Sequence, residues 1–236
     1  DYVDKVKAHL SRKYARDIEK FLGRFRVFIG NFPPTVEIAA SFLAQFSHLK
    51  QNTRARYCNM LKGFYGWYGE PLPFKVKSPK LLPTFVSDED VEKVLKRIRT
   101  KRKQHRIELD EMLIELPIHT GLRRGEMAAL KVGDITFTKT RSILFVRGGK
   151  GSRDRDIPLN SYIAAKLKHM VKGKKHEDKV LGLAAKTITQ RVGIWAKEAG
   201  VPHLKPHALR HKFAIELMNR GANLKVVQEL MGHESL

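Results

Sequence analysis

The sequence has very little cysteine and no long hydrophobic run. Its single cysteine, Cys58, cannot form a disulfide within the chain, which excludes a disulfide-stapled extracellular scaffold. We therefore expect a reducing compartment such as the cytoplasm. No apolar stretch approaches the ~20 residues of a membrane-spanning helix, so we expect no membrane partner.

Acidic residues are scarce beside basic ones. The 236 residues include 24 Asp+Glu against 46 Lys+Arg, which gives a formal net charge of +22 and predicts a polyanionic partner. Because 42% of the residues are hydrophobic, the chain can bury real cores and is no disordered basic tail. The composition alone fits a generic nucleic-acid binder as well as a more specialised one.

The basic excess is spread along the whole chain. Residues 1–82 hold 15 Lys+Arg and 6 Asp+Glu, and the remainder holds 31 and 18. The length suits two modest domains better than one. Two basic domains joined by a linker suggest a clamp around a nucleic-acid duplex.

Apolar periodicity and helix breakers indicate where the domains lie. Apolar residues, many of them aromatic, recur at helical spacing and predict a helical domain over residues 1–70 with the aromatics in its core. Four prolines within residues 71–86 oppose both helix and central strand, so this stretch is the expected linker. A second domain, residues 87–236, should begin with a helix capped by Ser87.

The second domain combines helices with one β-hairpin. Residues 141–147 and 155–159 have strand character and flank a glycine-rich turn. We therefore predict a mainly α chain with a small β-hairpin or sheet, which makes the second domain α+β.

Two motifs in this domain could bind phosphate. Arg123 and Glu126 are three residues apart at a helix start, which suits either a carboxylate-held guanidinium that grips phosphate or an ordinary helix salt bridge. Lys150, between glycines at the hairpin tip, could enter a DNA groove or stay solvated. Its surroundings lack the spacing of a nucleotide-binding P-loop.

Two further motifs lie nearer the end of the sequence. His207 and Arg210 share a helix face near its N-terminus, where the backbone N–H groups and the helix dipole favour an anion. His203, His207 and His211 also have a spacing that could bind metal, but no cysteine or catalytic glutamate accompanies them, so we expect no metal. His233 is by itself no more than one histidine near a terminus.

Candidate contacts to a DNA backbone lie in the first domain and the linker. Their side chains could neutralise phosphates or belong to ordinary solvated faces. They are Lys50, Arg54, Arg56, Lys75 and Lys77.

The combination of these motifs, and their order along the chain, resembles that of the tyrosine recombinase family of phage integrases and Xer site-specific recombinases. The resemblance covers nearly the whole chain, is most specific in residues 116–236, and implies a core-binding domain followed by a catalytic domain. The matching segments are TRARYCNMLKGFYGWY with LLPTFVSDEDVEKVL, TGLRRGEMAAL, GGKGSRDRDIPL, HALRHKFA and LKVVQELMGH.

The resemblance implies a reaction on duplex DNA that carries a specific recombination site. A tyrosine attacks a phosphodiester to give a 3′-phosphotyrosyl link and a free 5′-hydroxyl, and a second 5′-hydroxyl reverses the step without metal or other cofactor. The family also implies a homo-tetramer on paired sites.

The resemblance assigns a role to each motif. Arg123 and Arg210 would hold the non-bridging phosphate oxygens. Lys150 would protonate the leaving 5′-oxygen, and His207 would accept the proton of the tyrosine. His233 would donate to a phosphate oxygen.

The same resemblance implies two supporting residues and a nucleophile. Glu126 and His211 would orient the arginines and pack the site. The tyrosine is expected about nine residues after the Gly-His motif, which is beyond Leu236. We therefore expect a sequence truncated before its nucleophile, able to bind DNA but not to cleave it, and weakened in assembly.

Two other functions fit the same chemistry or the same fold. A type IB topoisomerase would relax supercoils without exchanging strands, and a catalytically silent relative would occupy sites as a regulator. The helical pattern of residues 52–68 favours a recombinase over a topoisomerase. The complete set of phosphate-binding residues argues against the silent regulator. Strand exchange between two sites would distinguish a recombinase from a topoisomerase.

Overall fold

The chain forms two compact units, Asp1–Leu82 and Pro83–Leu236. Each unit has its own buried hydrophobic cluster. None of the helices within the described residues is both long enough and apolar enough to cross a membrane. The computed structural model describes residues 1–79, 84–101, 104–148 and 154–232.

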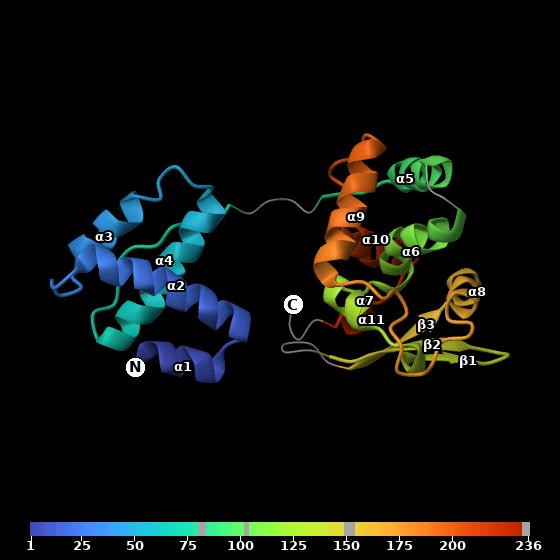
Figure 1. Cartoon of the computed structure of the whole chain (residues 1–236), viewed down its shortest axis with the longest axis horizontal. Helices are drawn as coiled ribbons and strands as arrows, with labels where there is room; N and C mark the ends of the chain where they lie inside the picture. The colour runs from blue at the N-terminus through green and yellow to red at the C-terminus, as the bar shows by residue number, and fades with distance from the viewer. Residues whose placement is uncertain (80–83, 102–103, 149–153, 233–236) are drawn as a thin grey trace. The chain divides into compact units, whose positions relative to one another are not determined.

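In the N-terminal unit, every described regular element is a helix (Figure 1). These helices are α1 Tyr2–His9, α2 Arg12–Ile29, α3 Val36–Ala44 and α4 Gln51–Tyr68. The Ser11 hydroxyl accepts a hydrogen bond from the Tyr14 N–H at the start of α2, and the Thr35 hydroxyl accepts one from Ile38 N–H at α3. Gly69, with a φ of 103°, ends α4 in the left-handed region.

Aromatic side chains fill the core of the N-terminal unit. Phe21, Phe25 and Phe42 are buried, and the ring centroids of Phe25 and Phe42 are 5.0 Å apart. The buried Tyr65 hydroxyl donates to the Thr35 carbonyl over 2.8 Å, and burial raises the pKa of Tyr65 to about 12. The prediction that the periodic aromatics pack in a core is confirmed for most of them, but Phe28 and Tyr68 are exposed.

The two ends of the proline-rich stretch 71–86 pack into different units. Leu72 is buried in the aromatic core of the N-terminal unit. The Gln51 side-chain amide donates to the Lys77 carbonyl over 2.9 Å, which holds the following segment against α4. Val86 is buried in the core of the C-terminal unit. The linker remains a prediction, since its middle lies outside the described residues.

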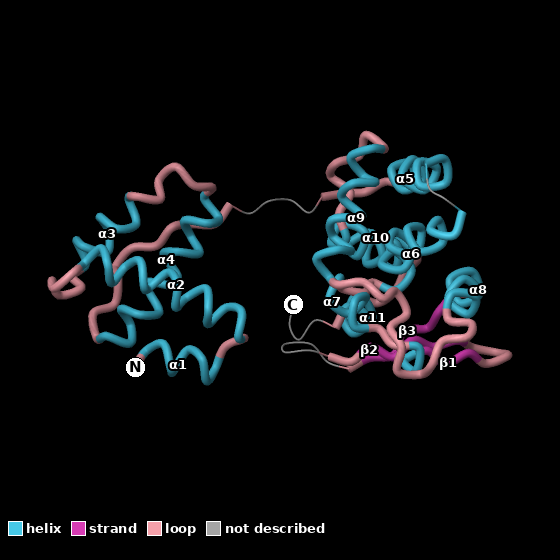
Figure 2. Tube along the Cα trace, viewed as in Figure 1, coloured by secondary structure: helices cyan, strands magenta, loops and turns pink. Residues whose placement is uncertain are grey.

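The C-terminal unit combines helices with a small sheet (Figure 2). Its helices are α5 Asp88–Lys101, α6 Gln104–Thr120, α7 Arg124–Ala129, the 3-10 turn η1 Val132–Asp134, α8 Ser161–Met170, α9 Ala185–Glu198, α10 Pro206–Asn219 and α11 Leu224–Met231. Ser87 caps α5 as predicted, because its hydroxyl accepts from the Asp90 N–H while the Asp90 carboxylate accepts from the Ser87 N–H, both over 3.1 Å.

The sheet is antiparallel, in the order β1-β2-β3. Its strands are β1 Ile135–Phe137, β2 Ser142–Val146 and β3 Arg155–Leu159. Leu144 in the middle strand lies opposite Ile135 and Ile157, so one sheet face is apolar and packs into the core. The sheet contains the predicted hairpin and one further strand, β1. This strand was not predicted, because three residues are too few to show an alternation of apolar and polar side chains.

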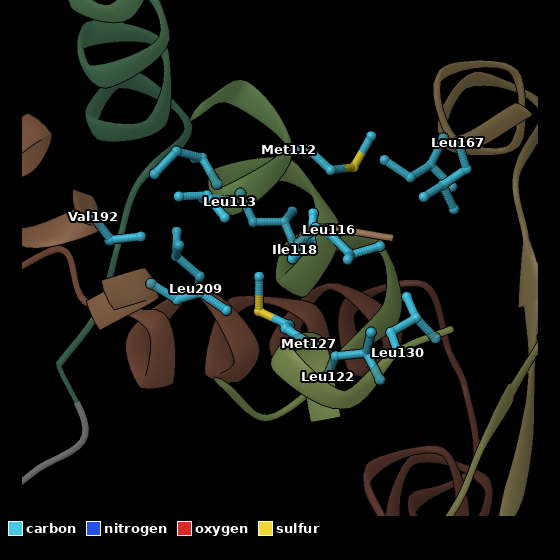
Figure 3. Packing of buried hydrophobic residues seen from close by; sticks show 14 of the residues in the cluster. Met112, Leu113, Leu116, Ile118, Leu122, Met127, Leu130, Leu167, Val192 and Leu209 are labelled. Atoms are coloured by element: carbon cyan, nitrogen blue, oxygen red, sulfur yellow. The ribbon is translucent and has the colours of Figure 1, made fainter. Parts of the chain in front are cut away.

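Helix α6 runs through the core of the C-terminal unit and contacts α5, α8, α9, α10 and β3. Its buried Leu113 and Leu116 lie among side chains from the surrounding helices, including Leu167, Val192 and Leu209 (Figure 3). Because α6 is held on several sides, the position where it ends is fixed by the core. The chain leaves α6 through Gly121 and enters α7 directly.

Gly121 joins α6 to α7 in a conformation that requires glycine. Its φ is 63°, and a Cβ there would lie 2.5 Å from a ring carbon of Phe213. Phe213 belongs to a small buried cluster between α10 and α11 that also contains Val227 and Met231. Gly121 therefore lets the α6–α7 corner approach α10 and α11 closely.

We expect Gly121→Ala to lower the free energy of unfolding of the C-terminal unit by about 2 kcal/mol or more, through the positive φ and the clash with Phe213. Gly193→Ala is the matched control, since Gly193 lies on the exposed face of α9 with nothing within 4 Å of its added Cβ. That change should stabilise the unit by ~0.5–1 kcal/mol. Urea unfolding monitored by circular dichroism measures the free energy of unfolding of both variants. Equal changes in the two variants would contradict the role given to Gly121.

Candidate active site

Arg123 and Glu126 meet at the start of α7. Arg123 is the N-cap residue, and its backbone N–H donates to Glu126 Oε2 over 2.8 Å. Its guanidinium Nη1 also donates to Glu126 Oε1 over 2.9 Å. The Glu126 carboxylate thus accepts from both the backbone and the guanidinium of Arg123. This caps the start of α7 and restricts rotation of the Arg123 side chain.

A second arginine, Arg155, holds the same carboxylate from the first residue of β3. Its Nη1 donates to Glu126 Oε1 over 3.1 Å, and its Nη2 donates to Oε2 over 2.8 Å. The Arg155 and Glu126 side chains are 6% and 12% exposed, so this pair is largely shielded from water. Burial alone would raise the pKa of Glu126, but the hydrogen bonds from Arg155 and Arg123 outweigh it and lower that pKa.

Arg210 lies in the first part of α10 and is almost completely buried, with 1% of its side chain exposed. Its guanidinium donates to the carbonyls of Gly121 and Met231. Its Nη1 lies 3.9 Å from Glu126 Oε2. Burial, together with the charge of Arg123, lowers the pKa of Arg210 to about 10. The guanidinium therefore stays protonated at neutral pH, but at a cost that a bound anion would reduce.

The three arginines also bind the C-terminal end of α11. Arg155 Nε donates to the Leu230 carbonyl over 2.7 Å. Arg210 donates to the Met231 carbonyl, and Arg123 Nη2 donates to the Gly232 carbonyl over 3.0 Å. A helix C-terminus leaves such carbonyls without partners and carries partial negative charge. The carbonyls belong to three successive residues, Leu230, Met231 and Gly232.

Arg123 and Arg210 line one pocket with a volume of about 410 Å³. The N-terminus of α10 borders it, with Pro206 at the first helical position and His207 next to it. The His207 and His211 rings are 4.5 Å apart between centroids and nearly perpendicular. The described lining residues are Arg123, Arg124, Thr189, Lys205, Pro206, His207 and Arg210, a set whose charges are positive and which suits an anion.

The structure brings together Arg123, Glu126, His207 and Arg210, which were predicted from sequence, and places His211 beside His207. Lys150 and His233 lie outside the described residues. Within the described ranges, no group of three or more His, Cys, Asp or Glu is placed to hold a metal ion.

The sequence patterns did not predict a role for Arg155 at this site. A usable signal was present, because Arg155, Ile157 and Leu159 alternate with the exposed Asp156 and Pro158 and share the buried face of β3. An arginine in register with two buried aliphatic residues must find a buried partner. The partner could not be named, because Glu126 is distant in sequence.

The candidate DNA contacts of the N-terminal unit differ in their surroundings. Lys50 is the exposed N-cap residue of α4. Arg54 is half-buried beside an apolar pocket between α3 and the segment after α4. Exposed Arg56 has one donor occupied by Asp17, with Nη2 to Oδ2 at 2.5 Å. The remaining two, Lys75 and Lys77, are exposed.

Solved structures with the same fold include two integrases. The Tn1549 transposon integrase in complex with circular intermediate DNA aligns with a TM-score of 0.78 and 20% identity, over 99% of this chain and 90% of that one. A lambda integrase dimer bound to a COC' core site aligns with a TM-score of 0.75 and 16% identity, over 99% and 94%. At these identities the likeness establishes the fold.

Proteins of similar sequence show to which family the chain belongs. Tyrosine recombinase XerA of Pyrococcus horikoshii is 30% identical over 96% of this chain and 81% of its own length. Tyrosine recombinase XerC of Staphylococcus aureus is 30% identical over 80% of this chain and 69% of its own length. The pattern of the Phage integrase family matches residues 84–236. The chain belongs to the phage integrase family of tyrosine recombinases.

We expect millimolar inorganic phosphate to raise the Tm of this chain by a few degrees relative to chloride at equal ionic strength, because the anion relieves repulsion between Arg123 and Arg210. Arg123→Gln should lose most of that rise. Lys168→Gln, at an exposed position of α8 that does not line the pocket, should keep the rise. A thermal denaturation series makes the comparison, and equal rises in all three proteins would show that phosphate binds elsewhere.

Proposed function

We propose that the protein is a site-specific DNA recombinase that cleaves and rejoins strands through a 3′-phosphotyrosyl intermediate. The observation that carries this proposal is the pair Arg123 and Arg210, which face one pocket and are held by Glu126 and by the end of α11. The tyrosine recombinase relatives support the reaction class.

The two arginines suit the transition state of phosphoryl transfer. When the tyrosine oxygen bonds to phosphorus, negative charge builds on the non-bridging oxygens, and two fixed guanidinium groups can each donate to them. Preorganised donors of this kind are commonly worth about 3 kcal/mol or more when removed. Because Glu126 and the α11 carbonyls already fix the guanidinium groups, little reorganisation is needed during the reaction.

Proton transfers complete the proposed reaction. The tyrosine proton passes to His207, which borders the pocket at the start of α10. The bond between phosphorus and the 5′-oxygen breaks as Lys150 gives that oxygen a proton, and His233 donates to a phosphate oxygen. The roles of Lys150 and His233 rest on their motifs. Rejoining reverses these transfers with a second 5′-hydroxyl, so no metal or nucleotide is consumed.

The rest of the chain has corresponding proposed roles. Residues 1–70 form a core-binding domain, residues 71–86 a linker and residues 87–236 the catalytic domain, which together clamp a duplex. Protomers assemble as a tetramer on paired sites, and the protein works in the cytoplasm. The single buried Cys58 is compatible with that reducing compartment.

Covalent trapping tests the proposal. The full product of the gene is incubated with end-labelled, nicked DNA from the source genome and analysed on a denaturing gel. We expect a protein–DNA adduct, reduced about 10²–10³-fold by Arg210→Ala or Arg123→Ala because each removes a phosphate donor. Lys168→Gln should cleave normally. An Arg210→Ala protein that cleaves normally would refute the site, and relaxation without two-site strand exchange would indicate a topoisomerase.

Salt dependence tests the proposed DNA contacts. We expect the logarithm of the binding constant to fall linearly with the logarithm of salt concentration, and Lys50→Gln to reduce the slope by about 0.9 because one phosphate contact is lost. Lys7→Gln is the matched control, since Lys7 is exposed on α1 and paired with Glu19 at 2.8 Å. Fluorescence anisotropy at several salt concentrations gives the slopes. Equal slopes for wild type and Lys50→Gln would remove Lys50 from the interface.

A further inference from the structure

We propose that Arg155 is a positioning residue for strand cleavage, which sets the orientation of Arg123 through Glu126 and fixes the end of α11. The inference rests on the proposed function and assigns a role to a residue of the hairpin segment to which the family resemblance gave none. Arg155 is buried and does not belong to the described lining of the pocket, so it acts through its neighbours.

The first contribution of Arg155 is geometric. Its fork binds both oxygens of Glu126, at 3.1 and 2.8 Å. With both oxygens held, the carboxylate has one orientation in which it accepts from the Arg123 side chain and from the Arg123 backbone. Without Arg155, Glu126 could rotate and Arg123 would lose its fixed direction toward the pocket.

The second contribution is electrostatic. A buried carboxylate next to Arg123 and Arg210 would cancel part of the positive charge that the phosphate meets. Arg155, which is not among the described lining residues of the pocket, compensates that carboxylate, so the group of three arginines and one glutamate keeps a net charge of two. In a largely buried site such charges act with little screening.

The third contribution joins separate parts of the fold. Arg155 Nε donates to the Leu230 carbonyl over 2.7 Å, so the first residue of β3 is tied to the end of α11. The same guanidinium is tied to α7 through Glu126. A change at Arg155 therefore reaches the two lining arginines by two routes, Arg123 through Glu126 and Arg210 through the end of α11.

The pH dependence of cleavage separates positioning from general stability. Among the described residues, the charged groups that face Glu126 are Arg123 at the start of α7, Arg155 on β3 and Arg210 on α10. Burial lowers the pKa of Arg210 to about 10, so its guanidinium stays protonated across the range of the assay. Removing Arg155 leaves the burial that raises the Glu126 pKa and removes the largest effect that lowers it. Glu126 would then be protonated in mild acid and would accept fewer hydrogen bonds from Arg123.

The experiment measures single-turnover cleavage of nicked DNA by the full gene product from about pH 5.5 to pH 8.5, a range that brackets an upward-shifted carboxylate. The proteins are wild type, Arg155→Gln, Arg155→Lys and Glu126→Gln. DNA affinity and Tm are measured for each. Rates are expressed as the ratio of variant to wild type at each pH, which removes titrations common to all proteins.

We expect Arg155→Gln to cleave about tenfold more slowly at the alkaline end and to fall further as the pH drops. Arg155→Lys keeps the positive charge but not the fork, so its ratio should be low and independent of pH. Glu126→Gln should also give a constant ratio, because the titrating group is gone. DNA affinity should change by less than about threefold in the Arg155 variants, since Arg155 does not touch the phosphate.

Arg147→Gln is the control for an arginine at the same hairpin. Arg147 is 70% exposed and binds Asp134 at 3.0 Å, away from Glu126. Its cleavage ratio should stay near one at every pH. The inference is overturned if Arg155→Gln cleaves like wild type, or if its ratio is the same at every pH while Arg155→Lys restores cleavage fully. Absence of any adduct from the wild type on its correct site would instead refute the proposed function.

Discussion

The structure of the candidate site depends on one buried carboxylate shared by basic groups from different elements. Glu126 accepts from Arg123 at its own helix start and from Arg155 on the sheet, and it lies 3.9 Å from Arg210 on α10. Burying a guanidinium is costly unless its donors are satisfied, so these elements must meet in one arrangement. A partly satisfied network would be worse than an apolar core. The need to satisfy Glu126 and its arginines therefore constrains where α7, β3, α10 and α11 can lie.

The hydrophobic core makes that arrangement possible. Helix α6 is buried from Asp110 to Ile118, so its end and the following Gly121 have a defined place against α10. The positive φ of Gly121 turns the chain directly into α7 and presents the Gly121 carbonyl to Arg210. The core thus fixes the backbone, and the backbone carbonyls in turn hold the guanidinium groups.

Local features could be predicted from the sequence, and non-local ones could not. The Ser87 cap and the aromatic core of the first unit follow from patterns within a few residues. The closeness of Arg123 and Glu126 follows from their spacing of three on a helix. The role of Arg155 depends on a contact with Glu126 across 29 positions of sequence, and on the register that places it at the start of β3. Helix periodicity carries no information about either.

The partners of Arg210 explain how a buried arginine can remain useful to a phosphate. Its guanidinium donates to the carbonyls of Gly121 and Met231, which accept hydrogen bonds without carrying a full negative charge. The nearby Glu126 carboxylate lies farther away, 3.9 Å from Arg210 Nη1, and is shared with Arg123 and Arg155. The repulsion from Arg123 and the burial that lower its pKa to about 10 are the ground-state cost of keeping two cations at one pocket. An anion between them removes part of that cost, and it removes more as the anion gains charge. Such a site therefore binds the transition state of phosphoryl transfer more strongly than the starting phosphodiester, which is the condition for catalysis.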